Sequence, residues 1–268
     1  MKLNIPTNCP FIGALSVLVL PQAVNAALLV HLPFDGDASD ATGNTSGATL
    51  NNGAVVNMSG RFGGALDVTS ANAGGAPTGG ASNAVVAAGT HLDSAFSNNA
   101  MAVSFHQFNN ATQASSSFWI HSPGAGANER GFQAHATWSD GTIYFDQSGC
   151  CGATQRLTTT GVILGQWQHF VFQRDADGNL EIWIDGALAN SSTGVEALDA
   201  FNGIITIGSE GNNANNGFDG LIDDFAVFDR ALTPAEIQNF STNPIPEPGS
   251  ALLGLLGAGL LMAKRRRS

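Results

Sequence analysis

One segment of the chain, residues 131–157, gathers aromatic, acidic and cationic side chains within a short stretch. It contains Trp138, Tyr144, Asp146 and Arg156, and Tyr144 is the only tyrosine of the chain. Aromatic faces stack on the apolar faces of sugar rings, whereas carboxylate and guanidinium groups form hydrogen bonds with ring hydroxyls. The segment therefore predicts a carbohydrate-binding surface formed by these four side chains.

The same segment has a second interpretation. Asp140-Gly141 favours a tight turn, so the segment also fits a hairpin whose aromatic side chains pack into a core. Cys150 and Cys151 follow this turn. Adjacent cysteines form a vicinal disulfide in an oxidising compartment or remain as two thiols, and the sequence leaves both states open.

Catalysis by a pair of carboxylates requires a defined spacing. Glu181 and Asp185 alternate along the segment "NLEIWID", with Trp183 between them. At about 3.3 Å per residue these carboxylates lie about 13 Å apart, whereas glycoside hydrolysis uses separations of about 5–9.5 Å. The sequence has no G-x-S-x-G, H-E-x-x-H or phosphate-loop pattern, and its six histidines form no ligand pair on one predicted element. We therefore expect a protein that is not an enzyme.

The first 26 residues have the pattern of a secretion signal. A cation at Lys2 precedes a short apolar run, and small residues lead up to Ala26, after which signal peptidase is expected to cut. The other end, residues 244–268, joins Pro246-Glu247-Pro248 to thirteen apolar residues and a basic cluster. As a helix the apolar run reaches about 20 Å, which is shorter than the bilayer core of about 30 Å.

Residues 27–243, between these two ends, are strongly acidic. They contain five arginines, no lysine and twenty acidic residues, which gives a net charge of −15. A field of this sign repels the phosphates of nucleic acids and of anionic lipids. We therefore expect no nucleic-acid partner, and instead neutral sugars, cations or basic partners.

An alternation of apolar and polar residues predicts β-structure through most of residues 27–243. One helix begins near Thr233, because Thr233 as the N-cap, Pro234 and Glu236 form a capping box. Many short strands separated by Gly, Asn and Asp indicate an all-β sandwich of two antiparallel sheets. The expected strands cover residues 27–34, 64–68, 83–89, 101–108, 117–122, 131–138, 141–146, 167–175, 179–185, 203–209 and 223–229.

Three stretches of the sequence share a further pattern: residues 29–44 with 60–68, residues 165–188 and residues 205–237, and the last carries "FDGLIDDF" and "DRAL" before the capped helix. Together they resemble the laminin-G-like jelly roll of the concanavalin A-like lectin/glucanase fold. The resemblance implies a jelly-roll sandwich. His106 stands where the family usually has tryptophan, and Trp183 replaces the middle acid of the family's glycosidase pattern.

The resemblance also implies that the first and last strands lie side by side. Asp35, Asp40 and Asn44 would then share a calcium ion with Asp223 or Asp224, since calcium takes oxygen ligands in flexible geometry. The alternative is that these residues form turns and bond their own backbone.

The end of the chain resembles the PEP-CTERM sorting signal. Pro246, Glu247 and Pro248 stand before the apolar run and the basic cluster, in the order of that signal. The resemblance implies a Gram-negative-type bacterium in which the tail is held briefly in the inner membrane and cut by an exosortase. A permanent single-span anchor is the alternative.

These observations predict an exported protein of the cell surface or extracellular matrix. Its single domain, residues 27–243, would bind carbohydrate or exopolysaccharide without catalysis, with calcium as a structural cofactor. A structural or adhesive module that contacts proteins is the alternative, and a polysaccharide hydrolase is a weaker one.

Overall fold

The structure is a computed structural model that describes residues 27–69, 80–123, 130–211 and 215–247. The predicted secretion signal, Pro248 and the apolar run of the sorting signal lie outside these residues. Within the described ranges, no helix combines the length and apolarity needed to cross a bilayer.

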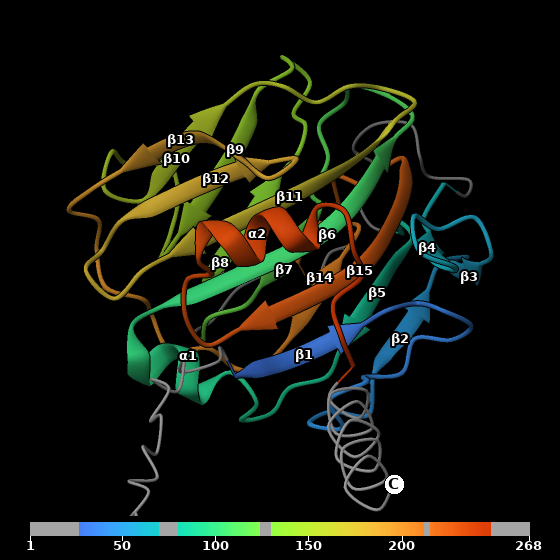
Figure 1. Cartoon of the computed structure of the whole chain (residues 1–268), viewed down its shortest axis with the longest axis horizontal. Helices are drawn as coiled ribbons and strands as arrows, with labels where there is room; N and C mark the ends of the chain where they lie inside the picture. The colour runs from blue at the N-terminus through green and yellow to red at the C-terminus, as the bar shows by residue number, and fades with distance from the viewer. Residues whose placement is uncertain (1–26, 70–79, 124–129, 212–214, 248–268) are drawn as a thin grey trace, which may run out of the picture.

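The described residues form two antiparallel sheets packed face to face (Figure 1). One sheet has eight strands in the order β13-β12-β11-β6-β15-β4-β3, with β1 paired to β15. The other has seven strands in the order β10-β9-β8-β7-β14-β5-β2. The strands of the eight-stranded sheet are β1 (Leu28–Leu32), β3 (Val55–Asn57), β4 (Ala65–Asp67), β6 (Met101–Asn109), β11 (Trp167–Arg174), β12 (Leu180–Ile184), β13 (Ala187–Ser192) and β15 (Gly220–Phe228). Those of the seven-stranded sheet are β2 (Ala48–Asn51), β5 (Asn83–Val86), β7 (Phe118–Ile120), β8 (Phe132–His135), β9 (Ile143–Gln147), β10 (Arg156–Thr159) and β14 (Ile205–Ile207).

Phenylalanine side chains from both sheets fill the space between them. Phe105 of the eight-stranded sheet packs against Phe118 of the seven-stranded sheet, with ring centroids 5.8 Å apart. Phe132 and Phe145 join the same core from β8 and β9. Successive side chains of a strand alternate between its two faces. The chain neighbours of each of these phenylalanines therefore point to the outer face of their sheet.

The predicted sandwich is confirmed. The first and last strands pair, as expected, and the hairpin around Gly178 joins β11 to β12. The short strands β2, β3, β10 and β13 and the helix α1 (Asp93–Asn98) were not predicted. β13, for example, is exposed along most of its length, and its sequence "ALANSS" therefore shows no alternation of apolar and polar residues.

The helix α2 (Pro234–Phe240) covers the outer face of the eight-stranded sheet (Figure 1). Its capping box is present, since the Thr233 side chain accepts from the Glu236 backbone N–H and the Glu236 side chain accepts from the Thr233 backbone N–H. Ile237 packs with Val171 and Trp183 of the sheet, and Ile245 belongs to the same cluster. The chain therefore stays packed on this sheet until just before Pro246.

Candidate functional site

The outer face of the seven-stranded sheet carries a row of polar and aromatic side chains from neighbouring strands. The register pairs Arg156 with Asp146, Asp146 with Gln133, and Gln133 with Trp119. Their chain neighbours, such as Phe145, pack in the core. Because the side-chain period of a strand is two residues, this register aligns all four side chains on the face away from the core.

Asp146 lies at the centre of this row and is fully buried. Its Oδ1 accepts from Arg156 Nε at 2.5 Å, and its Oδ2 accepts from Arg156 Nη2 at 2.7 Å. Gln133 donates to Oδ2 at 2.8 Å, and Arg130 Nη1 lies 3.5 Å from the same oxygen. Two parallel bonds to one carboxylate fix the plane of a guanidinium group. Asp146 therefore positions the arginines, because its own oxygens are already occupied.

Trp138, Tyr144 and Arg156 form a half-buried cluster beside Asp146. The guanidinium carbon of Arg156 lies 4.5 Å from the centroid of the Tyr144 ring, and Trp138 meets that ring edge-on with centroids 6.5 Å apart. The Tyr144 hydroxyl donates to Asp140 Oδ2 at 2.8 Å. The structure thus brings all four predicted sugar-binding residues together, with three of them reaching solvent.

The hairpin interpretation of this segment is correct for the turn and wrong for the aromatic side chains. A hairpin does turn at Asp140 and Gly141, where the Gly141 N–H donates to the Trp138 carbonyl at 2.9 Å. The aromatic side chains of Trp138 and Tyr144, however, lie on the outer face of the sheet and not in the core. Pairing of β9 between β8 and β10 determines this orientation.

His135 lies directly beneath the cluster. Its ring meets Trp138 edge-on with centroids 4.8 Å apart, and its Nδ1 lies 2.9 Å from the Ser115 carbonyl oxygen. Burial lowers the pKa of His135 to about 4. The imidazole is therefore neutral at pH 7, and the positive charge of this face comes from its arginines.

Cys150 and Cys151 form a vicinal disulfide at the edge of the cluster. Arg156 Nη2 lies 3.4 Å from Cys150 Sγ, and Cys151 is exposed. The sequence had left the disulfide and the free thiols as alternatives, and the structure contains the disulfide. The cystine lies beside the guanidinium group that covers Tyr144.

Two residues of this face were missed by the sequence analysis. Trp119 is fully buried, and the guanidinium group of Arg130 lies 5.0 Å from its ring centroid. The alternation Phe118-Trp119-Ile120 contained a signal, since it places Trp119 on the face opposite two core residues. Arg130 precedes β8 in a loop, and no local pattern relates it to Asp146.

The five predicted calcium ligands do not gather at one point. Asp40 accepts from the His31 backbone at 2.9 Å and from the Thr42 and Thr45 side chains at 2.8 and 3.0 Å. Asn44 donates to the Leu29 carbonyl at 2.9 Å. These two residues organise their own loop, as the turn-forming interpretation expects.

Asp35, Asp223 and Asp224 line a separate pocket of about 200 Å³. At this point β15 changes its partner from β4 to β1, and Asp224 adopts a positive φ of 51°. Asp223 Oδ2 accepts from the Phe62 backbone at 2.9 Å, whereas its Oδ1 is buried without a hydrogen-bond partner among the described residues. Burial, together with neighbouring Asp224, raises the pKa of Asp223 to about 7.

An unpaired buried carboxylate oxygen favours binding of a cation or a proton. Asp223 Oδ1 is such an atom, so this pocket fits a calcium ion better than the Asp40 loop does. In the described part of the chain, no group of three or more His, Cys, Asp or Glu side chains is arranged to hold a metal ion. Any ion here would therefore depend on backbone or water oxygens as well.

The two carboxylates considered for catalysis are engaged in structural bonds. Glu181 Oε2 accepts from Gln173 and from the Trp183 indole, each at 2.7 Å. Asp185 Oδ1 accepts from the His169 backbone at 2.8 Å. The bonds from Gln173 and His169 link this segment to β11, so both carboxylates help to hold the sheet together.

A serine–histidine pair, which sequence separation had concealed, lies on the outer face of the eight-stranded sheet. Ser104 Oγ is 2.8 Å from His169 Nε2, and both residues are only 1% exposed. Burial keeps a substrate from the hydroxyl group. The pair therefore has the geometry of a packing contact and lacks the access that a nucleophile needs.

Two antiparallel sheets packed face to face, one with a charged and aromatic outer face, define a jelly-roll sandwich of the lectin and glucanase type. A family model described as the concanavalin A-like lectin/glucanases superfamily, Laminin_G_3, matches residues 78–238. The chain belongs to this family. No curated protein sequence matches it.

Solved structures with the same fold include binding domains of larger proteins. Domain 4 of AbnA, an extracellular GH43 arabinanase from Geobacillus stearothermophilus solved with arabinotriose, is 21% identical with a TM-score of 0.59. The match covers 81% of this chain and 98% of that domain. The binding domain of botulinum neurotoxin DC, solved with rat synaptotagmin II, is 15% identical with a TM-score of 0.59, and the match covers 80% of this chain and 51% of that one. A second structure of that binding domain, solved with SialylT, is 15% identical with a TM-score of 0.57. The match covers 80% of this chain and 50% of that one.

Proposed function

We propose that this protein binds carbohydrate, as part of an extracellular polysaccharide or glycoconjugate, without hydrolysing it. The observation that carries the proposal is the half-buried cluster of Trp138, Tyr144 and Arg156, held in place by buried Asp146. Such a cluster offers aromatic surface to a sugar ring and guanidinium donors to its hydroxyls. The arabinotriose complex of the similar arabinanase domain supports a sugar as the partner.

Truncating either aromatic side chain is expected to weaken polysaccharide binding about tenfold. Trp138→Ala and Tyr144→Ala each remove a stacking surface that contributes on the order of 1–2 kcal/mol. Binding would be measured by glycan array and by pull-down on arabinan and other neutral polysaccharides. Trp167→Ala is the matched control, because Trp167 is also half-buried but lies on the eight-stranded sheet against Phe108. Unchanged binding by both site variants would refute this assignment of the site.

A protein partner is the alternative supported by a specific observation, since the neurotoxin binding domain of the same fold is solved with synaptotagmin II. A partner retained by the Trp138→Ala, Tyr144→Ala double variant, and insensitive to deglycosylation, would favour this adhesive role. Hydrolysis of a polysaccharide that a single carboxylate substitution abolishes would instead revive the enzymatic role.

We further propose that calcium binds beside Asp223 and stabilises the edge where β1 and β15 meet. The supporting observation is that Asp223 Oδ1 is buried without a hydrogen-bond partner among the described residues. EDTA is expected to lower the melting temperature by several degrees, because a ligand that binds only the folded state stabilises that state. Asp223→Asn should remove this sensitivity, while Asp37→Asn in the nearby exposed loop should retain it. A wild-type melting temperature unmoved by EDTA would exclude a stabilising ion.

Export and sorting complete the proposed function. The signal peptide would direct the chain out of the cytoplasm, and an exosortase would act near Pro246-Glu247-Pro248. Pro246 and Glu247 are exposed and directly follow Ile245, whose backbone N–H donates to Asp224 Oδ2 at 2.8 Å. This arrangement supports the proposal, because cleavage there would leave the segment up to Ile245 packed on the domain. The domain would then be released to the cell surface or matrix.

A further inference from the structure

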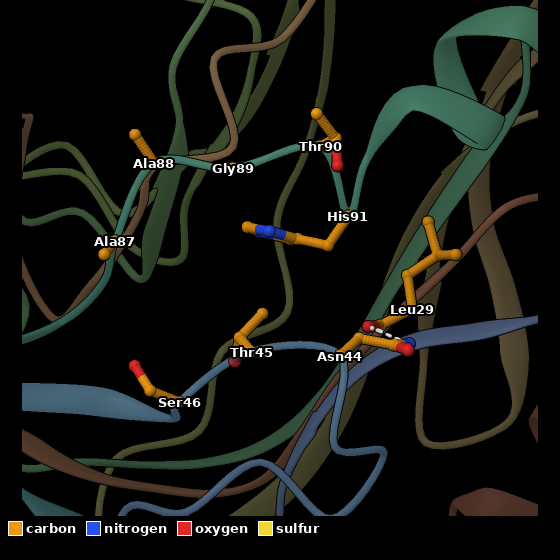
Figure 2. Close-up of a pocket in the computed structure, with 9 residues that line it drawn as sticks. All are labelled: Leu29, Asn44, Thr45, Ser46, Ala87, Ala88, Gly89, Thr90 and His91. Carbon is orange, nitrogen blue, oxygen red and sulfur yellow. Dashed lines mark hydrogen bonds between the residues drawn. The ribbon is translucent and has the colours of Figure 1, made fainter.

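A second cavity lies at the other edge of the seven-stranded sheet from the Tyr144 cluster. It measures about 520 Å³ and lies between the loop that leads into β2 and the segment that joins β5 to α1. Figure 2 shows Thr45 and Ser46 on one side, Ala87 to Thr90 on the other, and the His91 side chain reaching between them. β8, β7 and β14 separate this edge from β9 and β10 in the order of strands, so the two surfaces are independent (Figure 1).

Both walls of the cavity are held by hydrogen bonds to the rest of the domain. On one side, Thr45 donates from its backbone to Asp40 Oδ2 at 3.0 Å, and Asn44 donates to the Leu29 carbonyl (Figure 2). On the other side, the Gly89 N–H donates to the Asn202 carbonyl at 3.1 Å. The cavity is therefore preformed, and a ligand need not order its walls on binding.

Close packing fixes the second wall further. A Cβ atom on Gly203 would lie 2.3 Å from the Gly89 carbonyl oxygen, and Gly203 has a φ of +82°. Only glycine allows the two backbones to approach so closely in this conformation. The segment that carries Thr90 and His91 is consequently held against residues 202–203.

The polar groups of the cavity are neutral and partly unpaired. The hydroxyls of Ser46 and Thr90 have no hydrogen-bond partner among the described residues, and His91 Nε2 is buried without one. Burial lowers the pKa of His91 despite its hydrogen bond with the Gly203 backbone, so the ring is neutral at pH 7. The lining residues include neither a carboxylate nor a guanidinium group.

We propose that this cavity is a second binding site, which takes one neutral sugar ring or a similar polyol. The hydroxyls of the exposed residues Ser46 and Thr90 can donate to and accept from ligand hydroxyls, with the His91 ring between the two walls, and the volume falls within the usual range for small-molecule sites of about 300–1,000 Å³. An anion would find no positive charge in the lining, and nearby Asp40 and Asp93 would oppose it. The strongly acidic domain also disfavours an anionic sugar.

The test follows the His91 imidazole resonances by NMR while neutral monosaccharides are added to the wild-type protein. Glucose, galactose and arabinose are the probes, with glucuronate as the charged comparator, and His91→Phe assigns the resonances. At least one neutral sugar is expected to shift the His91 signals and to bind at least tenfold more weakly to the Ser46→Val, Thr90→Val variant. Ser191→Val, on the exposed strand β13, should bind like the wild type.

The proposal is overturned if no neutral sugar shifts the His91 signals, if the double variant binds as tightly as the wild type, or if glucuronate binds as well as the neutral sugar that binds most tightly. Melting curves of each variant show that it is folded. Tyr144→Ala should leave the His91 response intact, so failure of this cavity and failure of the Tyr144 surface are separate results.

Discussion

Replacing Asp146 by alanine is expected to lower the free energy of unfolding by about 3–5 kcal/mol and to abolish carbohydrate binding. The carboxylate is fully buried and binds Arg156 through both oxygens, while Gln133 and Arg130 share Oδ2. Its removal leaves the partly buried Arg156 guanidinium group without its counter-charge, whereas Arg130 keeps Glu210, whose Oε1 lies 4.0 Å from Arg130 Nη2. Arg156 would also lose the bonds that hold it over Tyr144. Urea titration and glycan binding measure the two effects.

A double-variant cycle separates this network from general damage to the fold. The Asp146→Ala, Arg156→Ala variant should be destabilised by clearly less than the sum of the two single variants, because one unpaired charge disappears with its partner. Asp140→Ala is the matched control on the same hairpin, because its exposed carboxylate accepts from the Tyr144 hydroxyl, and we expect little change in stability. A loss below about 1 kcal/mol for Asp146→Ala itself would show that the arginines do not depend on this carboxylate.

The second large effect is a loss of stability in mild acid. Burial lowers the pKa values of His106, His121 and His135 to about 4, from 6.5 in the unfolded chain. Between pH 6.5 and pH 4 the unfolded state binds protons that the folded state does not. The free energy of unfolding therefore has its full value above about pH 6.5 and falls as the pH drops toward 4. Each histidine accounts for about 2–3 kcal/mol between pH 7 and 4.5.

Asp223 acts in the opposite direction. Its folded pKa of about 7 lies above the ordinary aspartate value of 3.8, so the folded state gains a proton first and stability rises as the pH falls through 7. The protonation of Asp223 offsets about 3 kcal/mol of the loss from the three histidines, and burial also lowers the pKa of His169, so we expect a net loss on the order of 5 kcal/mol or more by pH 4.5. Urea titrations in EDTA at pH 7 and 4.5 measure it, with calcium removed so that Asp223 can titrate.

His121→Gln identifies one contributor to this pH dependence. The amide cannot titrate in this range, and it can still reach the Thr206 hydroxyl, which lies 3.2 Å from His121 Nε2. The variant should therefore lose less stability between pH 7 and 4.5 than the wild type, by about 2 kcal/mol. Equal stability of the wild type at the two pH values would contradict the buried neutral histidines.

The sequence by itself determined those turns, helix ends and strands whose conformation depends on neighbouring residues along the chain. The turn at Gly178, the capping box of Thr233 and Glu236, and the alternating strand at Phe145 could all be identified from a few adjacent residues. Short exposed strands such as β13 escaped detection, because their hydrogen bonds come from a neighbouring strand and not from an apolar pattern.

Tertiary structure alone decided what the polar side chains do. Asp40 lies in a loop and Asp223 in β15, and both come from acidic segments, yet Asp40 is saturated by its own loop while Asp223 keeps a buried oxygen without a partner among the described residues. Asp146 was predicted to contact a ligand and instead positions Arg156, with Arg130 reaching it from a loop before β8. The physical reason is that a periodic pattern fixes which face of a strand a residue occupies, whereas its partners depend on the register of strands far apart in the chain.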